Sequence, residues 1–241
     1  MEHMTTGVLI FEGMRIGVQD GDLTVSVDEH GEVNANLVLS TSYNILPIWL
    51  QIAYENAVAA KRANENISER WCEDNAVQKE LLLAELTPSI QVFVACGAAF
   101  DALYDQLRPF AKISESDIAA WKKKRTRRSA QIVEVCRRVF ALDNEITKAF
   151  KVNIRGIMEF RDQLLHPTHE IKQACTRPDI PVGVDWRFSA YRHHNASIAY
   201  RRTMEMLIHM YEKKAKDAGA QENMEVIFKA LKEINLVHEN A

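Results

Sequence analysis

The chain of 241 residues is long enough for one large domain, or for a main domain with a small appendage. Its hydrophobic share of 47% and charged share of 26% are typical of a globular protein with a core, while only 9 glycines and 6 prolines favour long helices over a loop-rich β fold. The formal net charge of −3 excludes an overall basic field, so any nucleic-acid binding must depend on a local patch.

The cysteines and the chain start indicate where the protein works. Cys72, Cys96, Cys136 and Cys175 lie far apart and form no C-x-x-C pair, so we interpret them as buried free thiols of a reduced, cytoplasmic chain rather than as a disulfide or metal framework. The N-terminus lacks the charged start and apolar run of a signal peptide. Nowhere do about eighteen apolar residues follow one another, so the sequence predicts no membrane span.

The first 45 residues are predicted to form a small β-meander. Segments 14–18, 23–27 and 32–39 are rich in Val, Ile, Leu and Thr, and turn sequences with Asp and Gly lie between them. Three strands alone hardly make a stable domain, so we expect the meander of residues 1–45 to pack against the helical part or against a partner.

Residues 46–241 are predicted to form one helical domain, which makes the fold mainly α. Apolar residues recur there at spacings of three and four, and capping residues and prolines such as Thr87-Pro88 mark helix starts. The predicted helices cover residues 47–66, 87–107, a short segment that follows Ser114 or Ser116 and carries Trp121, then 129–142, 143–166, 196–216 and 221–234.

A long connection, residues 167–195, interrupts these helices. A connection of that length within a compact domain is usually functional or a flexible excursion. Residues 182–188 within it are predicted to form a strand that joins the N-terminal meander.

The helix at 143–166 carries the strongest functional signal. Successive residues of a helix are about 100° apart, which places Arg161 in the middle of an apolar face. A guanidinium keeps its charge, so it requires a carboxylate, a carbonyl cluster, a cleft or a phosphate there. Asp101 or Asp105 of the predicted helix 87–107 is a candidate carboxylate, in which case the role of Arg161 is structural. The apolar face consists of Ile146, Phe150, Ile154, Ile157, Leu164 and Leu165.

Two more polar residues flank Arg161. Asp162 and His166 are four residues apart, so the carboxylate can touch the imidazole, and Pro167 ends the helix at His166. Arg161 and His166 nevertheless point about 140° apart on a regular helix. They meet only if the last turn unwinds, or if two copies of the helix face each other across a dimer axis.

Arg161, Asp162 and His166 resemble the motif of the HEPN superfamily, in which Arg is followed by a polar residue and, after four to six residues, by His. The segment 98–103 resembles the first helix of that family. The resemblance covers about residues 85–170 and implies a HEPN-like antiparallel helical bundle. Here Pro167 and Thr168 follow His166, so the Tyr that is modified in some toxin members is missing.

The resemblance implies a dimeric, metal-independent endoribonuclease, in keeping with toxins and phage-defence effectors of the family. His166 would be the general acid or base, Arg161 would hold the phosphate, and Asp162 would orient the pair. Homodimerisation and an antitoxin or other protein partner are expected, and no cofactor or metal. The alternative, also compatible with the family, is a non-catalytic helical sensor or protein-interaction module.

A basic segment supplies the local patch. Six cations lie among the seven residues 122–128, which suits phosphate contacts with RNA or a solvated turn between helices. Trp121 beside them suits base stacking or a place in the core. These cations are Lys122, Lys123, Lys124, Arg125, Arg127 and Arg128.

Further histidines leave two interpretations open. His166, His169 and Glu170, with His193 and His194, are metal-ligand types, but their spacing matches no known metal site. If they bind no metal, residues 191–194 either border the expected RNA-binding cleft or form an exposed polar loop.

Overall fold

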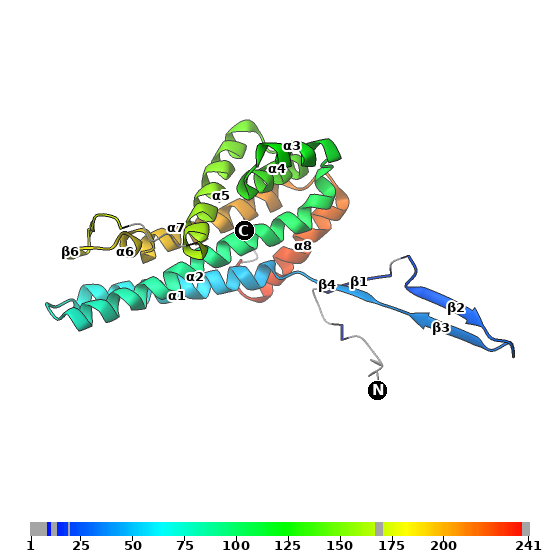
Figure 1. The fold of residues 1–241 in the computed structure, drawn as a ribbon, viewed down its shortest axis with the longest axis horizontal. Helices are drawn as coiled ribbons and strands as arrows, with labels where there is room; N and C mark the ends of the chain where they lie inside the picture. Colours follow the sequence, from blue (N-terminus) through cyan, green and yellow to red (C-terminus); the bar gives the residue numbers. More distant parts are fainter. Residues whose placement is uncertain (1–8, 11–13, 19, 167–170, 238–241) are drawn as a thin grey trace. The chain divides into compact units, whose positions relative to one another are not determined.

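The computed structural model describes residues 9–10, 14–18, 20–166 and 171–237. It separates into two compact units, Met1–Asn44 and Ile45–Ala241. The chain is mainly helical with a small N-terminal sheet region (Figure 1).

The N-terminal unit consists of antiparallel strand pairs rather than the predicted three-stranded meander. β2 pairs with β3 and β1 pairs with β4. The predicted third strand, 32–39, contains β3 alone, and β4, which starts at residue 40, is a strand that the sequence did not predict. Asp28 explains the tight β2–β3 turn, because its carboxylate accepts from the backbone N–H groups of His30 and Glu32. The strands are β1 (Met14–Gly17), β2 (Leu23–Val27), β3 (Val33–Leu37) and β4 (Ser40–Tyr43).

The strands of this unit bury little. β2 and β3 are exposed along their whole length, including the apolar side chains of Leu23, Val25 and Val33. A two-stranded ribbon without a covered face is marginally stable in water. The apolar side chains therefore remain without a core within this unit.

The helical unit is arranged around one long helix, α2, which contacts α1, α4, α5, α7 and α8 (Figure 1). α1 and α2 form a helical hairpin, and the others pack along α2. The helices are α1 (Leu46–Arg70), α2 (Asn75–Leu107), the 3₁₀ turn η1 (Arg108–Ala111), α3 (Glu115–Lys124), α4 (Arg128–Phe140), α5 (Asn144–Leu165), α6 (Trp186–Ala190), α7 (His193–Lys213) and α8 (Ala218–Glu233).

The prediction that α2 starts at Thr87-Pro88 is wrong. The helix starts at Asn75, where the Asp74 carboxylate accepts from the N–H groups of the first turn, and Pro88 lies inside it. The hydroxyl of Thr87 donates to the carbonyl of Leu83 at 2.9 Å. Packing of α2 against α1 on both sides of Pro88 outweighs the single backbone hydrogen bond that proline removes.

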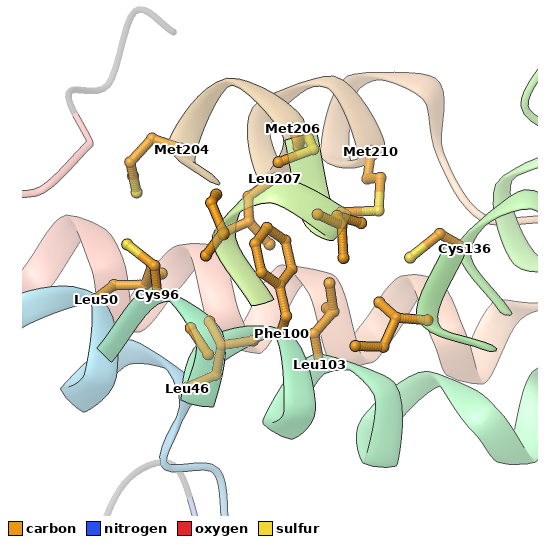
Figure 2. Close-up of a cluster of buried hydrophobic side chains, with 14 of the residues drawn as sticks. Leu46, Leu50, Cys96, Phe100, Leu103, Cys136, Met204, Met206, Leu207 and Met210 are labelled. Atoms are coloured by element: carbon orange, nitrogen blue, oxygen red, sulfur yellow. The ribbon is translucent and has the colours of Figure 1, made fainter. Parts of the chain in front are cut away.

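The core lies between α2 and its neighbours. Figure 2 shows Phe100 of α2 pointing toward Leu207 of α7, and the α7 methionines Met204, Met206 and Met210 lie around these two side chains. Cys96 and Cys136 are buried in this core, where burial raises the pKa of both thiols to about 12. All four cysteines are free, as predicted, but Cys72 is exposed and Cys175 half-buried.

The connection 167–195 is largely ordered where the structure describes it. β5 (Cys175–Arg177) pairs with β6 (Ile180–Val184), and α6 follows. β6 therefore pairs with a neighbour in the sequence rather than with the N-terminal strands. Ile180 and Val184 pack on Ile67 of α1 and on Leu81 of α2, so the hairpin covers the far end of the α1–α2 pair.

Helix α2 together with η1 is long and apolar enough to cross a membrane by length and composition, and half of its apolar stretch is buried inside the protein. The buried core helix of a helical bundle can have the same length and composition.

Candidate functional site

The C-terminal half of α5 is held by aromatic contacts. The ring of Phe160 stacks on Phe93 of α2, with 5.0 Å between centroids. The hydroxyl of Tyr191 donates to the carbonyl of Phe160 at 3.0 Å, and its ring meets both phenylalanines edge-on. Tyr191 is therefore a buried support for the residue before Arg161, and the prediction of an exposed polar loop is wrong at this position.

Gly97 makes room for Arg161 where α5 crosses α2. A Cβ at residue 97 would lie 2.5 Å from Cδ of Arg161, closer than any ordinary contact. The missing side chain at this position allows a close approach, and the approaching group is the stem of the arginine. The glycine thus fixes the path that the guanidinium takes between the two helices.

Arg161 is paired with two carboxylates. Its Nη1 donates to Asp101 at 2.5 Å, while Nη2 and Nε donate to Asp162 at 2.9 and 3.1 Å. The side chain is 15% exposed. Burial alone lowers the pKa of Arg161, but the hydrogen bonds to Asp162 and Asp101 more than compensate and raise it. The charge that the apolar face made unexpected is therefore balanced by carboxylates.

Asp101 also receives a second arginine. Its Oδ1 accepts from Nε of Arg128 at 2.8 Å, while its Oδ2 accepts from Arg161. Arg128 reaches Asp105 as well, at 3.3 Å, and its guanidinium lies 3.6 Å from the centre of the Tyr104 ring. Two features that are separate in the sequence, Arg161 and the basic segment, thus meet on one carboxylate of α2.

The charges of this cluster decide what it can bind. Two guanidiniums, Arg161 and Arg128, face the three carboxylates Asp101, Asp105 and Asp162. Three of the five N–H donors of Arg161 are engaged among the described residues, which leaves two for another acceptor. Because carboxylates outnumber guanidiniums in this cluster, an anion bound here would need further positive charge nearby.

His166 lies at the other end of the motif. It is the C-cap of α5, and its backbone N–H still donates to the carbonyl of Asp162 at 2.9 Å. Its side chain is exposed, and the structure records no contact of the imidazole with Arg161 or Asp162 among the described residues. The helix remains regular to Leu165, so the unwinding that would bring Arg161 and His166 together within one chain is not seen.

The rest of the basic segment lies at the junction of α3 and α4. Lys122, Lys123 and Lys124 occupy the last turn of α3, where positive charge suits the negative end of the helix dipole. Arg125 follows with a positive φ of 49°. Arg127 forms an ion pair with Glu159 of α5, which places this junction beside the end of the motif helix.

The possible metal ligands are not gathered. Among the described residues, no three His, Cys, Asp or Glu side chains lie together in a way that could hold a metal ion. His169 and Glu170 lie outside the described residues. His193 begins α7, where burial lowers the pKa of its side chain and its backbone N–H donates to Glu85.

No protein-family model, curated protein or solved structure matches this chain. The description of the site therefore depends on the geometry alone. Asp101 is one of the carboxylates that the sequence offers to Arg161, but the predictions from the sequence include neither the support by Tyr191 nor the link from Asp101 to Arg128. Asp101, Tyr104 and Asp105 are spaced by three and four residues and so share one side of α2. This spacing was the signal in the sequence that could have indicated a binding surface for a second arginine.

Proposed function

We propose that this chain is a HEPN-like, metal-independent endoribonuclease that acts as a homodimer. The observation that supports the proposal most is the shared carboxylate Asp101, which joins Arg161 of the motif to Arg128 of the basic segment. Phosphate-binding charge and the candidate catalytic helix are thereby parts of one cluster. A role as a toxin or defence effector, held in check by an antitoxin protein, would suit such an activity.

The proposed reaction uses only groups of the protein and the RNA. His166 takes the proton of a ribose 2′-hydroxyl, and the oxygen attacks the adjacent phosphorus. The bond to the 5′-oxygen breaks as that oxygen receives a proton from water, and the imidazolium of His166 then returns its proton to the solvent. The two remaining donors of Arg161 hold the phosphate as its charge grows, while Asp101 and Asp162 fix the guanidinium. The products are a 2′,3′-cyclic phosphate and a 5′-hydroxyl.

A second subunit supplies what one chain lacks. Arg161 and His166 of one chain do not converge, since α5 is helical up to Leu165. The cluster around Asp101 also carries one carboxylate more than it has guanidiniums. A partner helix that faces the first one would bring His166 to the Arg161 of the other chain, together with additional cations.

The test is RNA cleavage in EDTA. Unmodified protein should cleave single-stranded RNA to cyclic-phosphate ends, and His166→Ala should lower the rate by about two orders of magnitude or more. His194→Ala is the matched control, because His194 is also exposed and lies outside the cluster. Equal cleavage by both variants, or none by the unmodified protein, would sink the proposal.

One observation favours a second candidate, a non-catalytic helical module. The guanidinium of Arg161 is already paired with two carboxylates within its own chain, as a structural arginine would be. Under this candidate, His166→Ala keeps full partner binding and the unmodified protein never cleaves RNA. The two candidate functions are separated by a pull-down of the partner with the unmodified protein and with His166→Ala, carried out beside the cleavage assay.

A further inference from the structure

A pocket beside the Arg161 cluster combines positive charge with aromatic rings. It has a volume of about 350 Å³ and lies where α2, α3 and α4 meet. We call it the α3 pocket and define it by the residues that the argument uses. These are Tyr104, Arg108, Trp121, Lys122, Arg125 and Arg128.

The charge of the α3 pocket comes from separate parts of the chain. Arg108 begins η1, Lys122 and Arg125 belong to the end of α3, and Arg128 begins α4. None of the residues that line the pocket carries a carboxylate. Arg128 forms ion pairs with Asp101 and Asp105, which do not line the pocket. The helix dipole accounts for cations at the end of α3, but not for the arginines that approach from η1 and α4.

The aromatic side of the pocket is only partly occupied. The guanidinium of Arg128 lies 3.6 Å from the centre of the Tyr104 ring, and that of Arg108 lies 6.0 Å from it. Trp121 is half-buried and lines the pocket, and no ring or cation contact of the indole is found within the described part of the chain. An indole that is held in place without a stacking partner suits a flat ligand.

We propose that the α3 pocket binds one nucleotide, with its base stacked on Trp121 and its phosphate held by Arg108, Lys122 and Arg125. The pocket is within the size range of small-ligand sites, roughly 300–1,000 Å³. Stacking on an aromatic ring accepts any base, and the cations recognise the phosphate. The nucleotide is either a free mononucleotide or one member of an RNA strand.

The pocket and the motif are connected through Arg128. This arginine lines the pocket and also binds Asp101, whose second oxygen binds Arg161. A strand with one nucleotide in the α3 pocket would continue toward the proposed cleavage site. The inference deepens the proposed function and rests on it for the choice of an RNA strand, whereas binding of a mononucleotide does not require cleavage.

Binding is measured with the full chain that carries His166→Ala, so that RNA remains intact. The ligands are a fluorescein-labelled uridine decamer, followed by anisotropy, and unlabelled AMP, followed by calorimetry. Trp121→Ala and Lys122→Glu should each weaken binding about tenfold or more. Lys213→Glu should change it less than about twofold, because Lys213 occupies the last turn of α7 as Lys122 does in α3, but lines no such pocket.

The two ligands show whether the pocket takes a free mononucleotide or one nucleotide of an RNA strand. Binding of AMP that depends on Trp121 identifies a free nucleotide, and Trp121-dependent binding of the decamer without binding of AMP identifies the strand. Both results support the proposal, whereas binding of neither ligand overturns it. Unchanged binding of both ligands by Trp121→Ala overturns it, as does an equal loss in Lys122→Glu and Lys213→Glu. Trp121→Phe is the control for misfolding, because phenylalanine keeps a stacking face. If Trp121→Phe has an unchanged melting curve and yet loses as much ligand binding as Trp121→Ala, the stacking role is overturned.

Discussion

Two arginines of this protein, Arg177 and Arg161, each bind two carboxylates, yet their surroundings differ. Arg177 is fully buried and donates to Glu85 at 2.7 Å, to both oxygens of Asp179, and to the carbonyl of Phe188. Arg161 keeps 15% of its side chain exposed, and one of its acids, Asp162, is 55% exposed. Four donors of Arg177 are engaged, against three of Arg161.

The difference assigns Arg177 a structural role and leaves Arg161 as the candidate for the proposed site. The Arg177 cluster fixes the β5–β6 hairpin to α2 and leaves no opening for a ligand, since Glu85 is 1% exposed and also accepts from the backbone N–H of His193. The Arg161 cluster is open on the side of Asp162 and connects to a basic segment through Asp101. The ion pairs of Arg177 and Arg161 are similar, but the two arginines differ in burial and in the number of N–H donors that remain unengaged. These two differences, rather than the ion pairs, indicate different roles.

The largest effect on stability is expected at the buried cluster. Glu85→Ala leaves Arg177 charged and enclosed, and should lower the free energy of unfolding by about 3–5 kcal/mol in urea titrations. Glu205→Ala, which removes an exposed partner of Arg202, should cost about 1 kcal/mol or less. A comparable loss in both variants would contradict the view of Arg177 as a buried anchor.

Arg161→Met tests the other member of the comparison. It leaves Asp101 with Arg128 and partial exposure, so the free energy of unfolding should fall by only about 1–2 kcal/mol. RNA cleavage should nevertheless be lost, whereas Arg62→Met on the exposed surface of α1 should change neither property. A loss of stability as large as that of Glu85→Ala would make Arg161 a second anchor.

A smaller effect is expected from the glycine under Arg161. Gly97→Ala gains helix propensity but pushes the Cδ of Arg161 aside, and should lower stability by about 1 kcal/mol and slow cleavage. The matched control is Gly156→Ala in α5, where nothing lies within 4 Å of the new Cβ and the propensity gain of roughly 0.5–1 kcal/mol should remain. Equal gains in the two variants would show that Gly97 does not position the arginine.

The smallest effect is a dependence on pH at the Arg177 cluster. Hydrogen bonds from Arg177 hold the pKa of Asp179 below its usual value, so the folded state binds a proton there less readily than the unfolded chain. Its contribution to stability is present above about pH 4 and is lost as the pH falls further through the folded pKa. The melting temperatures of the unmodified protein and of Asp179→Asn should differ at pH 6 and converge below pH 4, and a constant difference would contradict this.

The sequence predicted what depends on neighbouring residues. Ser114 and Asp143 accept from the first-turn N–H groups of α3 and α5, as their residue types indicate. The apolar face of α5 is correct for Phe150, Ile154 and Ile157, while Leu165 is 54% exposed, because the helix end leaves the core. Arg161 required a partner on the same argument, and one of the acids named in advance, Asp101, provides it.

The sequence did not reveal what depends on distant packing. Glu85 and Arg177 are 92 residues apart, and neither stands out from its local pattern. The start of α2 was misplaced because Thr87-Pro88 is a good local signal that packing against α1 overrides. The pairing of β1 with β4 could not be predicted either, because the residue pattern of a strand does not specify which strand it pairs with.

The central claim is that Arg161 of one subunit and His166 of the other form one site, and mixing of two inactive variants tests it most directly. Arg161→Met and His166→Ala are each purified, mixed in equal amounts, unfolded and refolded together, and then assayed for RNA cleavage in EDTA. Random pairing makes half of the dimers mixed, each with one intact site, so about a quarter of the unmodified activity should return. If each variant refolds to a dimer and no activity returns in the mixture, the shared site is contradicted.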